Sequence, residues 1–361
     1  MVPVIDLSRR ARSLHPHFAA RVAAIAERGQ LLLGPETSGL EDELARWAGV
    51  DHAVAVSSGA AAIQLALQAL GVAPGDEVIV PAFTAVPTAS AVAVLGAVPV
   101  PVDVERDTAN LDPLLVEAAR TERTRAVVVV HLYGRPATLP LTDLPIVEDA
   151  AQAHGAVDDH TRSAATTYSF YPTKNLGGIG DGGAVVTARA DLATRVRRLR
   201  THGMTEQYVH EDIAQNFRMS EVEAAWLRIG LPLLDGWNRR RQEIAARYRA
   251  AAPGLRWQRG SAHHVHHLTV FRTDDREAAR ARLAELGIAS AVHYPLAITQ
   301  QPAYRHLTRT ACTEAEAWAR TCVTVPCFPE MTDAEVEQVA AALATVQADL
   351  GDRSGAGGAR R

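Results

Sequence analysis

The sequence contains almost no lysine. Of its 37 basic residues, 36 are arginines and only Lys174 is a lysine. Arginine stays protonated in proteins, whereas a lysine amine can lose its proton and act as a nucleophile. The single lysine is therefore the first candidate for a chemical role that arginine could not fill.

Other absences exclude whole classes of protein. No apolar run approaches the roughly 18 residues that a membrane helix needs, and the first residues, MVPVIDLSRR, lack the charged-then-apolar pattern of a signal peptide. A net charge of −4 gives no basic footprint for nucleic acid. We therefore expect a soluble cytoplasmic protein that binds neither membranes nor nucleic acid.

Cysteine is also scarce. The three cysteines, Cys312, Cys322 and Cys327, have no metal-ligand spacing and cannot all pair within one chain. We interpret them as reduced thiols packed as small hydrophobic side chains. The 361 residues are 47% hydrophobic and 22% charged, which is typical of a folded globular protein and excludes disorder as the dominant state.

Short β-rich runs alternate with helical patterns through most of the sequence. Strands are predicted at 53–56, 77–80, 98–102, 126–130, 145–148, 167–170 and 184–187. Helices are predicted at 58–70, 86–95, 112–119, 191–200, 220–229 and 234–251. This alternation predicts an α/β fold with a mostly parallel sheet covered by helices. The fourteen residues between 130 and 145 include Pro136 and Pro140, so we expect a loop or a single helical turn there.

A change of pattern at Pro253-Gly254 predicts a second, smaller unit. It would contain a strand at 268–272 and helices at 276–286, 313–320 and 333–346. The predicted boundaries are 1–252 for the large domain and 253–350 for the small α+β domain. The Gly-rich segment 351–361 is expected to be a disordered tail.

Two motifs follow predicted strands. In VSSGAAAIQLALQALG the chain passes from a strand through Ser57, Ser58 and Gly59 into a helix, an arrangement that can bind an anion but also begins many ordinary helices. In LPIVEDAAQAHG, Glu148 and Asp149 end an apolar strand, where open α/β sheets bind ligands. Strand alternation lets only one of the two acids face a site, and a structural ion pair is the alternative interpretation.

The segment YSFYPTKNLGGIGDGG surrounds the single lysine. Gly178, Gly180 and Gly183 fit the G-x-G-x-x-G spacing, but the following AVVTARA is typical of a strand, whereas that dinucleotide fingerprint opens a helix. We therefore expect a flexible loop that approaches a ligand closely beside Lys174.

Two further segments are rich in polar side chains. HHVHH at 263–267 suggests a metal site, but strand alternation would put His264 and His266 on one face and His263 and His267 on the other, with no carboxylate or cysteine close by. We interpret them as strand-edge histidines and predict no metal. AVHYPLAITQQPAY is either a surface loop or part of a site.

Together these segments resemble the nucleotide-sugar aminotransferases of the DegT/DnrJ/StrS family, which are fold-type-I pyridoxal 5'-phosphate (PLP) enzymes. The resemblance runs from about Leu32 to Leu343 and is carried in order by LGPETSGLEDELARWAGVDHAVAVSSGAAAIQLAL, GVAPGDEVIVPAFT, VVVVHLYGRPA, VEDAAQAHGA, YSFYPTKNLGGIGDGGAVVT, QNFRMSEVEAAWL, GWNRRRQEIAARY and HYPLAITQQPAY. It implies a large PLP-binding domain with a mostly parallel seven-stranded sheet between helices, and a smaller α+β domain.

The resemblance also implies roles for single residues. Lys174 matches the lysine that forms the Schiff base with PLP and then moves protons as base and acid. Asp149 matches the aspartate that pairs with the pyridine nitrogen, and Gln152 the amide beside the phenolic oxygen.

Four further positions match residues that hold the cofactor phosphate. Ser169 and the backbone amides of Gly59 and Ala60 would contact it within one chain. Asn216 would reach it from the neighbouring subunit, so the resemblance implies a homodimer with shared active sites. His293, Tyr294, Tyr171 and Gln301 are the expected substrate-binding residues.

The sequence departs from the family pattern at several places, two of which bear on the cofactor site. Ala60 and Ala61 lack the hydroxyl and carboxylate usual at this helix start, and Ala85 occupies the position of the aromatic residue that stacks on the pyridine ring. Phe83, two residues earlier, is the candidate replacement for that aromatic residue.

The resemblance implies transfer of an amino group from L-glutamate, or glutamine, to a ketone on a nucleotide-linked 6-deoxysugar, with a dTDP-sugar as the commonest family substrate. The product would be an amino sugar for a secondary metabolite, such as an antibiotic, or for a surface glycan. HYP followed by QPAY favours amination at C3 and NFRMSE at C4, so this choice stays open. The alternatives are an aminocyclitol (keto-inositol) aminotransferase and a catalytically idle regulatory or binding relative.

Overall fold

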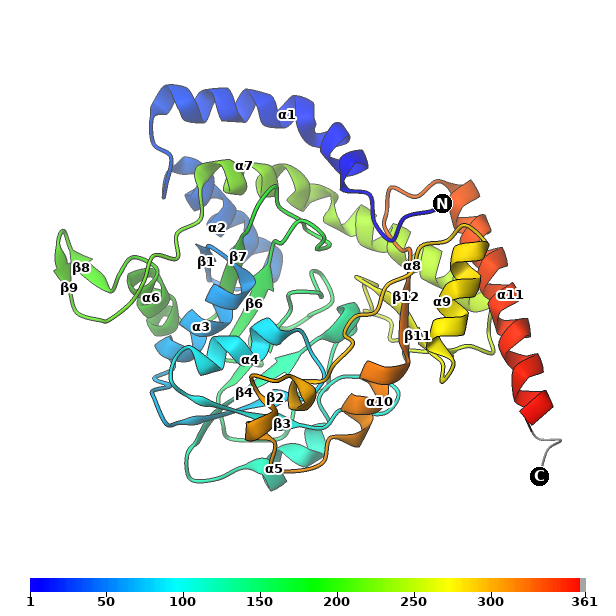
Figure 1. The fold of residues 1–361 in the computed structure, drawn as a ribbon. Helices are drawn as coiled ribbons and strands as arrows, with labels where there is room; N and C mark the ends of the chain where they lie inside the picture. Colours follow the sequence, from blue (N-terminus) through cyan, green and yellow to red (C-terminus); the bar gives the residue numbers. More distant parts are fainter. Residues whose placement is uncertain (358–361) are drawn as a thin grey trace.

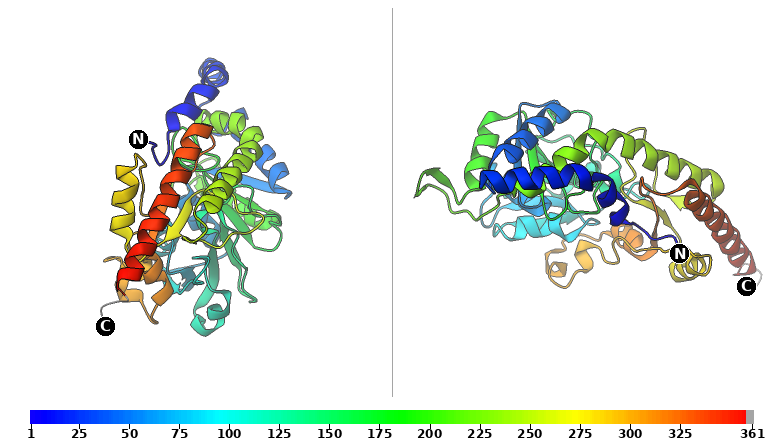
Figure 2. Two further views of the ribbon diagram at one scale, coloured as in Figure 1. Left: turned by 90° about the vertical axis from the view of Figure 1, so that its right-hand side faces the viewer. Right: turned by 90° about the horizontal axis from the view of Figure 1, so that it is seen from above.

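The computed structural model describes the backbone of residues 1–357 and the side chains of residues 1–351. A central sheet lies between layers of helices, and a smaller group of strands and helices packs beside it, near both ends of the described chain (Figure 1). Two further views show the long helix α1 lying over the helical layer and α11 along one flank (Figure 2).

The central sheet has seven strands in the order β1-β7-β6-β5-β4-β2-β3. They are β1 (His52–Val56), β2 (Glu77–Pro81), β3 (Val98–Val102), β4 (Thr124–Val130), β5 (Ile146–Asp149), β6 (Ala165–Ser169) and β7 (Gly183–Thr187). Only β7 runs antiparallel to its two neighbours. Since the other strands are parallel, the turns after β1, β2, β5 and β6 meet at one edge. The fold is therefore the predicted α/β arrangement with a mostly parallel seven-stranded sheet.

Both faces of this sheet are buried. On β1, Val54 and Val56 belong to one hydrophobic cluster with α3 (Gly59–Ala69) and α6 (Ala190–Leu199), whereas Ala53 and Ala55 belong to another with α2 (Pro35–Ala48) and α7 (Glu221–Gly230). This alternation follows from the period of two in a strand. Helix α1 (Leu7–Arg28) packs outside this second layer, against α7.

The smaller unit is built on a three-stranded antiparallel sheet of β10 (Arg256–Trp257), β11 (Thr269–Arg272) and β12 (Cys322–Val325). The helices α8 (Leu234–Ala251), α9 (Arg276–Glu285) and α11 (Asp333–Gly357) pack around it in one cluster that includes Ile244 and Tyr248 of α8. Helix α10 (Thr313–Thr321) instead places Ala315 and Trp318 in the large cluster of the central sheet. The boundary near residue 253 stays a prediction, and segments from both sides of it share these cores.

The remaining elements are short. They are α4 (Val86–Ala93), α5 (Val116–Ala119), the hairpin of β8 (Met204–Glu206) and β9 (Val209–His210), and the 3₁₀ turns η1 (Pro113–Leu115), η2 (Leu132–Gly134), η3 (Leu231–Leu233), η4 (Ile298–Gln300) and η5 (Arg305–Leu307). The single turn η2 confirms the short connection predicted between 130 and 145.

Several predictions of local structure were wrong. The segment 263–267 is not a strand: His266 adopts φ 44°, and the His264 and His266 rings stack with their centroids 3.7 Å apart. The helix predicted at 112–119 divides into η1 and α5. Helix α11 runs from Asp333 to Gly357 and residues 358–361 lie outside the described residues, so the disorder predicted for 351–361 stays a prediction.

The three cysteines are buried free thiols. Among the described residues, no three His, Cys, Asp or Glu side chains gather as they would around a metal ion. None of the helices in the described part of the chain is both long and apolar enough to cross a membrane.

Candidate active site

A cavity of about 310 Å³ opens where the parallel strands of the central sheet end. The turn from β1 into α3, the turn from β2 into α4, the end of β5 and the loop after β6 all contribute to its wall. It is lined by Ser58, Gly59, Ala60, Ile63, Thr84, Ala85, Pro87, Thr88, Val130, Asp149, Ala151, Gln152, Ser169, Tyr171, Lys174 and Asp181. The structure therefore brings seven of the predicted site residues into one cavity: Gly59, Ala60, Asp149, Gln152, Ser169, Tyr171 and Lys174.

Lys174 lies in the tight loop that returns the chain from β6 to the antiparallel strand β7. Its backbone is fixed, because its N–H donates to the carbonyl of Tyr171 at 2.8 Å and Arg10 donates to its carbonyl at 3.1 Å. No hydrogen bond or ion pair holds its amine within the described part of the chain. Burial lowers the pKa of Lys174 to about 8, against the opposing attraction of Asp149. The side chain thus combines an anchored backbone with an amine that can be deprotonated near neutral pH.

The loop after Lys174 packs closely against α7, and its approach to a ligand stays a prediction. The N–H of Gly178 donates to the carbonyl of Phe170 at 2.6 Å, and a Cβ on Gly178 would collide with the carboxylate of Glu223. The following strand, β7, confirms that these glycines do not open a helix. They permit a compact return loop.

Asp149 and Glu148 point to opposite sides of β5, as strand alternation predicts. The carboxylate of Asp149 accepts a hydrogen bond from Thr88 Oγ1 at 2.9 Å and another from the N–H of Ala151 at 3.1 Å. Glu148 instead pairs with His131 at 2.9 Å, away from the cavity. An ionised carboxylate accepts more than two hydrogen bonds, so Asp149 can also receive one from a protonated ring nitrogen.

Gln152 links the cavity to the smaller unit. Its Oε1 accepts from the N–H of Tyr133 at 2.6 Å, and its Nε2 donates to the hydroxyl of Tyr294 at 2.8 Å. The hydroxyl of Tyr133 in turn donates to the carbonyl of His293. These contacts hold the HYP segment against the end of the central sheet.

The opposite end of the cavity is suited to a phosphate. Ser58 caps α3, and its hydroxyl accepts from the N–H of Ala61 at 3.1 Å, which leaves the amides of Gly59 and Ala60 at the helix end for a ligand. A Cβ on Gly59 would lie 2.5 Å from Cβ of Ser169, so only glycine allows the two turns to approach this closely.

Five predicted residues do not line this cavity. His293 and Tyr294 line a separate cavity on the other side of Lys174, and the other three lie elsewhere. Phe83 does not line the cavity: it is fully buried against Tyr133, Tyr294 and Trp318, and Ala85 occupies the cavity wall, so the proposed replacement of the stacking aromatic was wrong. Gln301 lines neither this cavity nor the separate cavity on the other side of Lys174. Asn216 is exposed, and its Oδ1 accepts from Arg218, so its expected role in a neighbouring subunit stays a prediction.

Sequence reasoning missed Thr88, which holds Asp149. The two residues are 61 positions apart in the chain, and a threonine at the start of a helix carries no signal of such a partner. Only the folded structure, in which α4 lies close enough to the end of β5 for this hydrogen bond, shows it.

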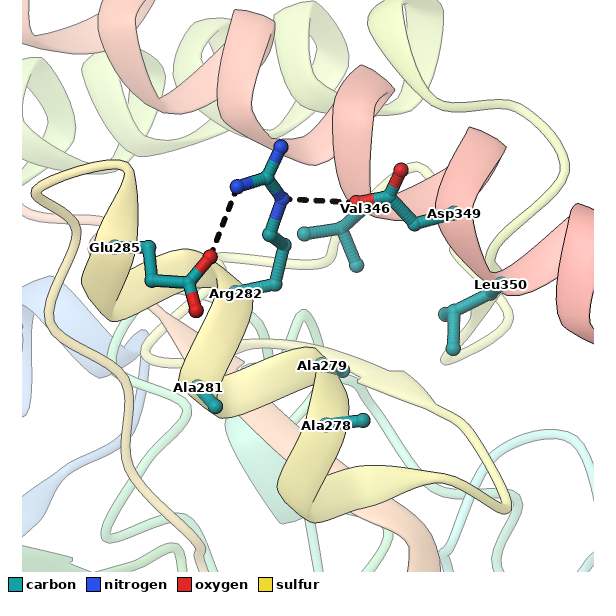
Figure 3. A pocket seen from close by; sticks show the side chains of 8 residues that line it. All are labelled: Ala278, Ala279, Ala281, Arg282, Glu285, Val346, Asp349 and Leu350. Carbon is teal, nitrogen blue, oxygen red and sulfur yellow. Dashed lines mark hydrogen bonds and ion pairs between the residues drawn. The ribbon is translucent and has the colours of Figure 1, made fainter.

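A second hollow, of about 390 Å³, lies between α9 and α11. Figure 3 shows Arg282 extended between Glu285 and Asp349, with which it forms ion pairs at 2.9 and 2.8 Å. Three alanines and two aliphatic side chains make up the rest of its lining: Ala278, Ala279, Ala281, Val346 and Leu350. Because its charges satisfy one another, this hollow offers no reactive group.

Comparison with known proteins decides the family. Residues 13–344 match the DegT/DnrJ/EryC1/StrS aminotransferase family. The chain is a member of this family. It is a PLP-dependent aminotransferase, and its fold is that of the family's solved structures.

Individual relatives cover nearly the whole chain. It is 44% identical over 348 residues to the dTDP-3-amino-3,4,6-trideoxy-alpha-D-glucose transaminase of Streptomyces venezuelae, covering 91% of this chain and 92% of the relative. It is 40% identical to the erythromycin biosynthesis sensory transduction protein EryC1 of Saccharopolyspora erythraea, covering 95% and 98%. The crystal structure of S. venezuelae DesV in complex with a ketimine intermediate superposes with a TM-score of 0.89 at 41% identity, covering 95% of this chain and 98% of DesV.

The donor groups of the cavity fit PLP. Asp149 retains acceptor capacity for a pyridinium nitrogen, and Lys174 offers an unengaged amine for an aldehyde. The close approach of Gly59 to Ser169 forms a cradle that a side chain would fill. Each of the cofactor's three polar ends therefore has a matching group in one cavity.

Proposed function

We propose that this aminotransferase moves an amino group from L-glutamate to the C3 ketone of a dTDP-linked keto-6-deoxysugar. The observation that carries the proposal is the cavity in which Lys174, Asp149 and the Gly59–Ser169 cradle come together. Names of relatives support the sugar position, since the S. venezuelae and Aneurinibacillus thermoaerophilus enzymes are both named as 3-amino dTDP-sugar transaminases.

Amination at C3 is also favoured by relatives that are named for sugars linked to another nucleotide. The enzymes of Acidithiobacillus ferrooxidans and Pseudomonas aeruginosa are named for UDP-linked 3-dehydro and 3-oxo sugars, at 38% and 36% identity. Position 3 thus recurs while the nucleotide varies. This supports C3 over C4 more strongly than it supports dTDP over UDP.

PLP, when bound, supplies an electron-accepting ring that stabilises negative charge on the carbon from which a proton is removed. Asp149, held by Thr88 and the N–H of Ala151, would keep the ring nitrogen protonated. The amides of Gly59 and Ala60, with Ser169, would hold the phosphate. Gln152 would orient the ring edge on the side of Tyr294.

Lys174 would act as the base that removes a proton from one carbon atom and as the acid that returns it to another during the amino-group transfer. Its amine can take a proton and return it, because its pKa of about 8 lies close to neutral pH. Its anchored backbone limits this motion to the side chain. Arginine could not replace it, since its guanidinium does not release a proton.

We also propose that the enzyme works as a cytoplasmic homodimer. Asn216 is exposed, forms an isolated β-bridge with Thr201, and would complete the phosphate site of a second copy. The β8–β9 hairpin, a few residues earlier in the chain, projects from the molecule (Figure 1). Exposed apolar side chains nearby, Tyr208 and Ile213, support an interface here. The division into domains at 1–252 and 253–350 is part of the same proposal.

The test is a panel of 3-keto nucleotide sugars, 4-keto nucleotide sugars and a keto-inositol, each incubated with PLP and L-glutamate, with products identified by mass. We expect 2-oxoglutarate and a 3-amino dTDP-sugar. A 4-amino product would move the proposal to C4, and turnover of a keto-inositol alone would make the enzyme an aminocyclitol aminotransferase. PLP binding without turnover of any ketone in the panel would contradict the proposed function.

A further inference from the structure

Apart from the cofactor cavity and the hollow between α9 and α11, a further cavity of about 380 Å³ lies on the other side of Lys174 from the cofactor cavity. It shares Tyr171 and Lys174 with that cavity and extends to helix α8 and the strand β12. Its volume is within the roughly 300–1,000 Å³ typical of small-molecule sites. The residues that line it are Val4, Ile5, Tyr171, Thr173, Lys174, Arg241, His267, Leu268, His293, Tyr294, Val325 and Cys327.

Arg241 is the unusual member of this lining. Its side chain is 1% exposed, and its Nη1 donates to the carbonyls of His266, His267 and Cys327. Its Nε and Nη2 are buried and have no hydrogen-bond partner within the described part of the chain. A buried guanidinium with unused donors is costly unless an anion or water completes it.

The charges around Arg241 leave it uncompensated. The nearby carboxylate of Glu330 is already paired with Arg10 at 2.8 Å, and Arg10 also donates to the carbonyls of Lys174 and Asn175. None of the described residues lining the cavity is an Asp or a Glu. His267 and His293 are neutral, since burial lowers the pKa of both. The cavity therefore carries a net positive charge.

We propose that Arg241 binds a carboxylate of the amino-acid donor. This inference rests on the proposed function and assigns it a donor site. Lys174 and Arg241 line the same cavity, so an amino acid there could place its amino group near the cofactor and its carboxylate on the side of the guanidinium. Val4, Ile5, Leu268 and Val325 give apolar walls for the methylene groups.

The two half-reactions test this separately. L-Glutamate is added to the PLP-loaded holoenzyme without sugar, and the change in cofactor absorbance gives its apparent Kd. We expect Arg241→Met to raise the apparent Kd for L-glutamate about tenfold or more, because a charge-assisted hydrogen bond is lost. The sugar half-reaction, begun from the amino form of the cofactor, should change by no more than about twofold.

Arg249→Met is the matched control. Arg249 lies on the same helix, stacks over Trp257 and donates to the carbonyl of Gln258, outside the cavity. It should leave the apparent Kd for L-glutamate unchanged. Loss of the sugar half-reaction alone in Arg241→Met would assign the site to a phosphate and overturn the proposal. Equal loss of both half-reactions, or no change, would also overturn it.

A measurement on the unaltered holoenzyme covers the case in which Arg241→Met does not fold. Glutarate should raise the melting temperature, whereas uncharged glutaramide and inorganic phosphate should not. Equal effects of all three, or none, would overturn the inference. Because the L-glutamate titration and the melting-temperature measurement need no sugar, the donor site can be judged even if every nucleotide sugar fails as a substrate.

Discussion

The cofactor cavity and the hollow between α9 and α11 differ in chemistry rather than in size. Their volumes are about 310 and about 390 Å³. In the hollow, the charges of Arg282 are shared between Glu285 and Asp349 (Figure 3). In the cavity, the amine of Lys174 has no partner among the described residues, and Asp149 can accept a further hydrogen bond. Unsatisfied groups at the ends of parallel strands therefore identify the site, whereas concavity alone does not.

Among substitutions in the two concave regions, replacement of Lys174 should have the largest effect on turnover. Lys174→Ala and Lys174→Arg should each lower turnover by roughly 10⁴-fold or more, because covalent attachment and proton transfer are both lost. Neither variant should show the visible absorption band that PLP gives with the unaltered enzyme. Since no other lysine exists in the chain, a persisting band would contradict the assignment.

Asp149→Asn should have the next largest effect. An amide cannot hold a proton on the ring nitrogen, so kcat should fall about 10²–10³-fold while PLP still binds. Glu148→Gln is the matched control, since that side chain pairs with His131 outside the cavity. Glu148→Gln should lower the melting temperature but have little effect on the turnover of the folded holoenzyme. Equal loss of turnover in both variants would contradict the different roles of the two acids.

The pKa of Lys174 predicts how cofactor uptake depends on pH. Because burial lowers this pKa from 10.5 to about 8, the reactive amine becomes more abundant as pH rises toward 8. The rate of covalent PLP uptake by the apo-enzyme should rise about tenfold per pH unit below that value and level off above it. A rate that still climbs tenfold per unit above pH 9 would indicate an ordinary lysine.

An aromatic residue in place of Ala85 should modestly increase the affinity of the cavity for the cofactor. Ala85→Phe would supply the ring face that the cavity wall lacks, and aromatic stacking is worth about 0.5–1.5 kcal/mol. We expect two- to tenfold tighter binding of the amino form of the cofactor, roughly as that energy implies, measured by equilibrium dialysis. Weaker binding would show that Ala85 is needed for space.

The smallest effect is expected in the hollow. Arg282→Ala removes two partly exposed ion pairs, which contribute little to the free energy of unfolding because solvent screens them. Turnover should stay within about twofold of the unaltered enzyme. A large loss of turnover would remove the distinction between the two concave regions.

Much of the fold follows from local sequence patterns. Buried strands such as 126–130 are runs of valine and alanine, and the helix predicted at 234–251 has the observed bounds. Helix α1 was missed because it buries only Arg10, Leu14 and Ile25, which gives little apolar periodicity. Strand β12 was missed because it follows α10 directly, with no turn residue between Thr321 and Cys322.

The site was predictable where chain neighbours form it and not where distant segments do. Gly59, Asp149, Ser169 and Lys174 follow strands that end at one edge of the sheet. The position of Phe83 depends on Trp318, which lies far along the chain and captures its ring in the core. The folding of 263–267 likewise depends on tertiary contacts, because His264 bonds to Gln258 and His267 to Asn175.

The first residues of the chain have a practical importance for anyone who produces this enzyme. Val2 exchanges backbone hydrogen bonds with Gly287 and Ala289, Val4 and Ile5 line the cavity beside Lys174, and Arg10 supports the lysine's carbonyl. Trimming the first ten residues would remove these contacts, whereas Met1 itself is 83% exposed. The start of the chain should therefore be kept intact before any kinetic constant is compared between preparations.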